Sequence, residues 1–82
     1  MKLTVKYFAL LREAVGVSEE AVEVPQDALT VSELMKIAAE RHPEAFASLK
    51  RIRAAVNETM VPMSAAVKDG DVVAFFPPVT GG

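Results

Sequence analysis

Residues 30–42 read TVSELMKIAAERH and have the pattern of one amphipathic helix with a defined start and end. Thr30 and Glu33 stand at the spacing of a capping box, in which the threonine hydroxyl accepts from the Glu33 N–H and the glutamate reaches back to the Thr30 N–H. The apolar residues that follow recur at helical spacing and form one stripe of Val31, Leu34, Met35 and Ala38. His42 precedes Pro43 and ends the helix, because the residue before a proline avoids helical dihedral angles.

Strands are predicted on both sides of this helix. Residues 2–8 alternate in character and predict a strand with an apolar face of Leu3, Val5 and Tyr7. Phe8 breaks that pattern, because the alternation places it on the polar face with Thr4 and Lys6. Similar arguments predict strands at residues 20–25, 52–56 and 72–76, a short helix at 9–15 that ends at Gly16, and one helical turn at 45–49.

The order of the main elements is strand, strand, helix, strand, strand. One amphipathic helix covers only one face of a sheet, so the sequence predicts an α+β fold in which a mixed sheet carries the helix across one side. This is the β-grasp, or ubiquitin-like, arrangement, and we expect it to occupy residues 1–76. The alternative is a ferredoxin-like fold, which needs a second full helix between the later strands. Residues 57–71 contain Pro62 and Gly70 and offer no such helix.

Composition excludes several classes of function. The chain has 82 residues and a net charge of -2, which argues against a general nucleic-acid binder. It has no cysteine and one histidine, so we expect neither a thiol nucleophile nor a metal site, and a self-contained enzyme is the least expected function. No apolar run approaches the ~20 residues that cross a bilayer, so we expect a cytoplasmic protein without a membrane partner.

The last seven residues, FPPVTGG, predict an extended tail after the final strand. Pro77 and Pro78 cannot donate to a sheet ladder and favour an extended path, so we expect residues 77–82 to form a flexible arm. Gly81 and Gly82 carry no side chain, so the tip of the arm can enter a channel too narrow for a Cβ atom. On this interpretation the reactive group is the terminal carboxylate of Gly82.

Three segments resemble one known family. Residues 69–82, DGDVVAFFPPVTGG, are similar to the C-terminal signature of the molybdopterin synthase small-subunit family, which consists of ubiquitin-like sulfur carriers. Residues 5–9 (VKYFA) and 11–13 (LRE) resemble the opening motif of that family, and residues 54–57 (AAVN) resemble its third-strand motif. The family length also matches the whole chain.

The resemblance implies a carrier of sulfur in molybdenum cofactor biosynthesis. A ubiquitin-activating-like adenylyltransferase would use ATP to adenylate the terminal carboxylate of Gly82, the second residue of the Gly81–Gly82 pair. A persulfide donor would then convert this terminus to a thiocarboxylate. The large subunit would accept the arm and catalyse sulfur transfer to cyclic pyranopterin monophosphate, which builds the dithiolene of molybdopterin. The chain itself would be a non-catalytic sulfur-donor subunit that binds no cofactor.

The resemblance also implies a docking surface. Phe8, Met60 and Phe76 match positions that form an apolar patch against the large subunit and the activating enzyme. The tail residues Pro77, Pro78, Val79 and Thr80 complete the expected partner-binding set. From the residues alone, Phe75 and Phe76 point to opposite faces of their strand, so one packs on the helix and the other points out.

Other polar residues have simpler interpretations. His42 is expected to be a polar helix cap, and Asp69 and Asp71 are expected to form a turn around Gly70. Arg12 and the run of residues 50–53 (KRIR) make a modest basic patch. This patch is either a set of solvated strand and helix ends or a surface that steers acidic partners.

Three other functions stay open on sequence grounds. A protein modifier would be joined through Gly82 to lysines of target proteins. Its folded domain and its tail would resemble those of a sulfur carrier. The sulfur carrier for the thiazole of thiamin also ends in two glycines, although such chains are usually shorter and lack the FFPPV approach. A plain binding module with an inert tail is the third alternative.

Overall fold

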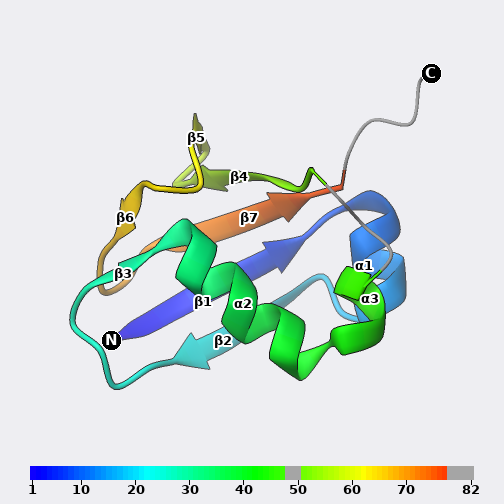
Figure 1. Cartoon of the computed structure of the whole chain (residues 1–82), viewed down its shortest axis with the longest axis horizontal. Coiled ribbons are helices and arrows are strands. Elements are labelled where there is room, and N and C mark those ends of the chain that lie inside the picture. The colour runs from blue at the N-terminus through cyan, green and yellow to red at the C-terminus, as the bar shows by residue number, and fades with distance from the viewer. Residues whose placement is uncertain (48–50, 78–82) are drawn as a thin grey trace.

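The computed structural model describes residues 1–47 and 51–77 (Figure 1). Its elements in chain order are β1 (Lys2–Tyr7), α1 (Ala9–Val15), β2 (Glu19–Glu23), β3 (Leu29–Thr30), α2 (Val31–Arg41), α3 (Pro43–Ala47), β4 (Arg53–Val56), β5 (Thr59–Val61), β6 (Ala66–Val67) and β7 (Val72–Phe76). None of the helices in this part of the chain has the length and apolar character that crossing a membrane requires.

A five-stranded mixed sheet organises the molecule, in the order β2-β1-β7-β4-β5. The central strands β1 and β7 run parallel, and the other neighbours are antiparallel. A two-stranded sheet of β3 and β6 lies at the other end from α1 and α3 (Figure 1). With α2 across one side, this arrangement confirms the predicted β-grasp fold.

Helix α2 begins at the predicted capping box. The Thr30 N–H donates to Glu33 Oε1 at 3.0 Å, and the Glu33 N–H donates to Thr30 Oγ1 at 3.2 Å. The helix ends at His42, whose N–H donates to the Ala38 carbonyl at 2.9 Å, as expected for a cap. Both ends of the helix are therefore fixed by local sequence.

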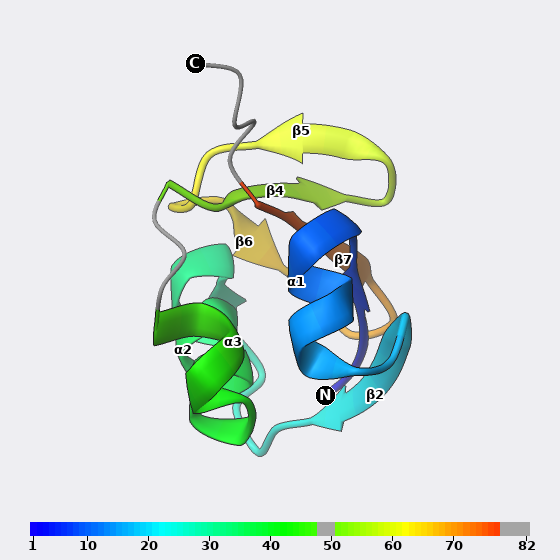
Figure 2. The same ribbon diagram turned by 90° about the vertical axis from the view of Figure 1, so that its right-hand side faces the viewer.

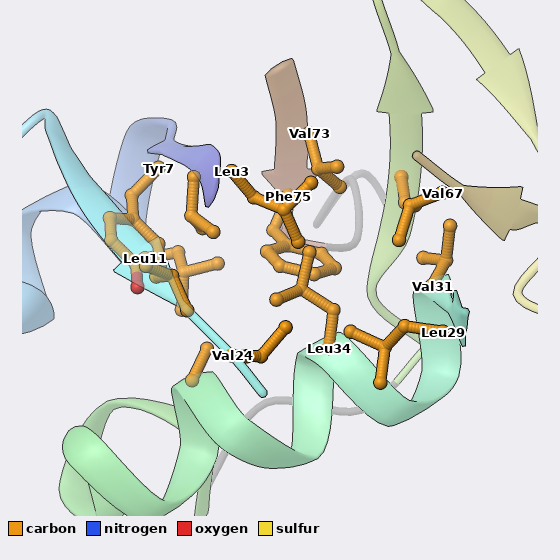
Figure 3. Packing of buried hydrophobic residues seen from close by; sticks show 14 of the residues in the cluster. Leu3, Tyr7, Leu11, Val24, Leu29, Val31, Leu34, Val67, Val73 and Phe75 are labelled. Atoms are coloured by element: carbon orange, nitrogen blue, oxygen red, sulfur yellow. The ribbon is translucent and has the colours of Figure 1, made fainter. Parts of the chain in front are cut away.

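The core lies between the sheet and α2 (Figure 3). The inner face of the sheet contributes the apolar residues predicted from alternation, and α2 contributes its stripe. The fully buried members include Val5, Tyr7, Leu11, Val31, Leu34, Val73 and Phe75. Met35 and Met63 pack against this cluster and are partly buried, in line with a gap-filling role.

Several element boundaries differ from the prediction. β1 ends at Tyr7, because Phe8 is the N-cap residue of α1 and the helix begins at Ala9. β2 spans Glu19–Glu23 where 20–25 was expected, and β4 begins at Arg53, one residue later than expected. Helix α3 starts at Pro43, because proline fits the first turn of a helix. The predicted end of that turn at Leu49 lies outside the described residues.

The sequence did not predict β3, β5 or β6. Each has only two or three residues, so no alternation can be counted within it. β5 pairs with the longer strand β4, and β3 and β6 pair with each other, so all three depend on contacts between distant residues that override weak local preference. The predicted boundary between a domain (1–76) and a tail (77–82) stays a prediction, because residues 78–82 are not described.

Candidate functional site

The face of the sheet opposite α2 carries the candidate site, and we call it the outer face. Figure 2 shows that α2 and α3 lie together on the other side of the sheet. Successive residues of a strand point to opposite faces, so every second residue of each strand lies on the outer face. Those that line a hollow of about 590 Å³ on this face are Lys6, Phe8, Ala55, Asn57, Glu58, Met60, Val72, Ala74 and Phe76.

The floor and the walls of this hollow are built from different residue types. Ala55 and Ala74 are buried although they face outward, because larger neighbours surround them. Phe8 and Met60 remain 40% and 55% exposed and form the walls. Small residues beneath large ones give a concave apolar surface, which suits a side chain from another protein.

Phe8 and Phe76 form the most defined contact on the outer face. Their rings are stacked, with centroids 4.7 Å apart and planes inclined by 14°. Phe8 is held by its backbone, because its carbonyl accepts from the N–H groups of Leu11 and Arg12 at 3.1 and 3.2 Å. Phe76 is the last residue of β7, so the stack marks the point where the tail begins.

Met60 is positioned by the hairpin between β4 and β5. Its turn residues Asn57 and Glu58 have positive φ angles of 50° and 71°, as a two-residue hairpin turn of type I′ requires. In the side chain of Asn57, Nδ2 donates to Asp71 Oδ1 at 2.9 Å, and Oδ1 accepts from the Val72 N–H at 3.0 Å. These bonds tie the hairpin to the start of β7 and fix Met60 relative to Phe76.

Asp71 is the buried centre of this support. Its side chain is 7% exposed, and its second carboxylate oxygen accepts from the Lys68 N–H at 2.8 Å. Asp69 accepts from the Lys2 N–H at 2.6 Å, and Gly70 turns the chain with a φ of 88°. Both aspartates therefore form the turn, as the sequence indicated. The sequence did not indicate that Asn57, 14 residues earlier, completes the network.

A second polar network supports the site from the inner side. The Tyr7 hydroxyl donates to Glu20, and His42 Nε2 lies 2.7 Å from the same carboxylate oxygen. Arg41 Nη1 lies 3.5 Å from the other oxygen. This network joins β1, the strand that delivers Phe8, to β2 and the end of α2.

The network shifts the pKa values of Tyr7 and Glu20. Burial and the hydrogen bond to Glu20 raise the pKa of the Tyr7 hydroxyl well above its ordinary value. Burial by itself would raise the pKa of Glu20, but hydrogen bonds from Tyr7 and His42 and the charges of His42 and Arg41 lower it below its usual range. Tyr7 is therefore a permanent donor at neutral pH, and Glu20 is a permanent acceptor.

The structure brings together three of the sequence-predicted site residues. Phe8, Met60 and Phe76 share one hollow, and Pro77 follows them, half-buried, as the last described residue. The remaining predicted residues, Pro78, Val79, Thr80, Gly81 and Gly82, lie outside the described part of the chain. The roles of all these residues stay predictions. Within residues 1–47 and 51–77, no group of three His, Cys, Asp or Glu side chains is placed to hold a metal ion.

Comparison with known proteins gives matches over the full chain. Residues 5–82 match the ThiS family. The molybdopterin synthase sulfur carrier subunit of Escherichia coli is 43% identical over 82 residues, which cover 98% of this chain and 99% of that protein. Among solved structures, the protein from Pyrococcus furiosus named "putative molybdopterin converting factor, subunit 1" superposes with a TM-score of 0.82. It is 36% identical and covers 96% of this chain and 99% of its own.

A third match carries a different name. The small archaeal modifier protein 1 of Haloferax volcanii superposes with a TM-score of 0.84 at 26% identity. The match covers 95% of this chain and 98% of that chain. The β-grasp fold is thus shared by proteins whose names describe sulfur carriage and protein modification.

Proposed function

The chain belongs to the ThiS family, and we therefore propose that it is the sulfur carrier subunit of a molybdopterin synthase. The observation that carries this proposal is the 43% identity over almost the full length with a protein of that name. The exposed apolar outer face beside the start of the tail supports it, because a carrier subunit must dock before it delivers its terminus. Since activation consumes ATP, the proposal is for a cytoplasmic protein.

The chemistry is carried by the terminal carboxylate of Gly82. A carboxylate oxygen attacks the α-phosphorus of ATP, pyrophosphate leaves, and an acyl-adenylate with a good leaving group results. The terminal sulfur of a persulfide then attacks the acyl carbon and displaces AMP. A thiol of the donor cleaves the resulting S–S bond, so that a disulfide forms on the donor and a thiocarboxylate remains on Gly82.

The assignment of the chemical steps to partner proteins follows from the groups that this chain provides. An apolar hollow lies beside the start of the tail, which supports a role in docking. Residues 77–82 span at most ~20–22 Å at ~3.3–3.6 Å per residue, enough to reach a recessed site in a partner. We therefore assign adenylation to the activating enzyme and sulfur transfer to cyclic pyranopterin monophosphate to the large subunit.

The outer face is proposed as the surface that docks the large subunit and, at another time, the activating enzyme. Phe8, Met60 and Phe76 supply aromatic and thioether groups of the kind that carry most interface energy when they are desolvated. The stack of Phe8 on Phe76 fixes the direction in which β7 ends. Docking on this face would therefore also aim the tail.

The test is intact-mass measurement of the full-length chain after incubation with ATP, an activating enzyme and a persulfide donor. We expect the mass to rise by the difference between sulfur and oxygen. Two variants serve as controls: one lacks Gly81 and Gly82, and one carries an additional serine after Gly82, which keeps both glycines but moves the carboxylate. Neither should gain sulfur. No mass gain in the wild type, with an enzyme that activates the E. coli relative, would contradict the proposal.

A protein modifier is the second candidate, because the H. volcanii modifier shares the fold over nearly its whole length. In that case Gly82 would form an isopeptide bond with lysine side chains of other proteins. Adducts that disappear when Gly81 and Gly82 are deleted would establish it, and transfer of sulfur to the pterin precursor by the large subunit would favour the carrier.

A further inference from the structure

Arg53 occupies a defined place beside the start of the tail. It is paired in register with Phe76, the last residue of β7, so it lies at the end of the sheet where the tail begins. Ala54 belongs to the core cluster, so alternation along β4 places Arg53 on the outer face with Ala55. Its side chain is exposed. A cation therefore stands on the surface that the proposed function uses for docking.

The side chains around Arg53 are apolar. Arg53 lines a hollow of about 320 Å³ together with Ile52, Met60, Val61, Pro62 and Met63. Met60 also lines the larger hollow described above, so the two hollows adjoin. Arg53 is thus a cation that lines an apolar hollow next to the one that Phe8 and Phe76 line.

None of the ion pairs in the described part of the chain includes Arg53. Among the other charged residues, Lys2 lies 4.0 Å from Glu23, and Lys6 and Glu58 both line the larger hollow. Arg53 is therefore a cation at the end of the sheet where the tail begins, and within the described residues it makes no ion pair.

Docking on the outer face would remove Arg53 from water. Burial of an unpaired charge is unfavourable, and a guanidinium is best compensated by a carboxylate that accepts two parallel hydrogen bonds. We propose that Arg53 binds an Asp or Glu side chain of the large subunit, placed at the rim of the pocket that receives the tail. This inference rests on the proposed function and adds a specificity-determining contact to it.

A phosphate of the activated terminus is the other anion of suitable chemistry. Six residues, 77–82, separate Phe76 from the end of the chain. To bring that end to Arg53, the arm would fold back on its own domain and could not enter a partner at the same time. A carboxylate on the partner meets Arg53 while the arm is engaged, so it is the better match.

The test is titration of the full-length chain with the large subunit of the same organism, by calorimetry and stopped-flow fluorescence at low and high salt. We expect Arg53→Glu to weaken binding about a hundredfold at low salt and much less at high salt, because a repulsion replaces an attraction. Arg53→Leu should weaken it about tenfold, and Arg53→Lys by about threefold, because lysine keeps the charge but not the planar fork. Lys36→Glu, exposed on α2, makes the same charge change away from the outer face and is the matched control.

Two results would overturn the inference. One is binding of Arg53→Leu that equals or exceeds that of the wild type, since a purely apolar rim would prefer leucine. The other is a loss for Arg53→Glu no larger than that for Lys36→Glu. If the wild type binds and Phe76→Ala weakens it while Arg53 variants do not, only the Arg53 contact fails. If the wild type does not bind at all, the proposed function fails with it.

Discussion

Phe75 and Phe76 are adjacent in the chain, and their rings lie on opposite faces of β7. Phe75 is completely buried between the sheet and α2, where it meets Phe46 edge to face with ring centroids 6.3 Å apart. Phe76 is only half-buried and stacks on Phe8 at the outer face. Two residues of the same type thus have different roles, because successive residues of a strand point to opposite faces, here the core and the surface.

The difference shows how a small sheet separates stability from recognition. The inner face holds the large core residues and is covered by α2, so its side chains contribute to folding (Figure 3). The outer face has alanines at its floor and exposed aromatic and methionine side chains at its walls. Substitutions on the two faces should therefore fail in different assays, and the following predictions use this contrast.

The largest expected effect is on the inner face. Phe75→Ala should destabilise the fold by ~3–5 kcal/mol, because it leaves a cavity in the core. That loss is a large part of the stability of a chain of this size, ~4–12 kcal/mol, so urea unfolding followed by circular dichroism should show a much lower midpoint. Phe75→Leu retains volume, and we expect a loss of ~1–1.5 kcal/mol in urea unfolding with large-subunit affinity unchanged. Weaker binding of the large subunit by folded Phe75→Leu would contradict the assignment of stability to the inner face and of recognition to the outer face.

On the outer face we expect a smaller effect, and it should concern binding of the large subunit more than folding stability. Phe76→Ala should weaken large-subunit binding by more than ~1 kcal/mol in calorimetry, since an aromatic anchor is lost. The same change should cost stability only ~0.5–1.5 kcal/mol through loss of the stack on Phe8. Val17 is 46% exposed outside the hollow, and Val17→Ala is the control for removal of an exposed apolar side chain. Equal affinity of the Phe76→Ala variant and the wild type would contradict docking on this face.

Much of this contrast was readable in the sequence. The alternation of residues 2–8 identified Phe8 as an outward aromatic, and the capping box located the start of α2. The position of Phe76 opposite Phe75 followed from the same period of two. These features are local, because each depends on residues within about one turn or one strand of each other.

The rest depends on contacts between distant residues. β5 has three residues, and Met60 takes its place because Asn57 bonds to Asp71 and Val72 across 14 and 15 positions. The contact of His42 with Glu20 joins residues 22 apart, so the sequence showed a helix cap but not its partner. Arg53 appeared only as part of a basic run, and its position beside Phe76 required the register of β4 on β7.

The smallest expected effect concerns acid stability, and it arises on the inner side. The pKa of Glu20 is lower in the folded protein than in the unfolded chain, so the ionised carboxylate favours the fold. This contribution is complete above the ordinary glutamate pKa of roughly 4.3 and is lost as the pH falls through the lower folded-state value. Urea unfolding should therefore show stability that declines with acid in the wild type.

Glu20→Gln tests the origin of that decline. Glutamine keeps an oxygen that accepts from Tyr7 but does not titrate, so the variant should be less stable at neutral pH and show a shallower loss in acid. Glu44→Gln, on the exposed start of α3, should keep the wild-type slope. Because Glu20 lies on the inner side of the sheet, large-subunit affinity per folded molecule should be unchanged in both variants at neutral pH. An identical acid slope in the two variants would exclude the Glu20 network as the source, and a loss of affinity confined to Glu20→Gln would show that the two faces are coupled through Tyr7 and Phe8.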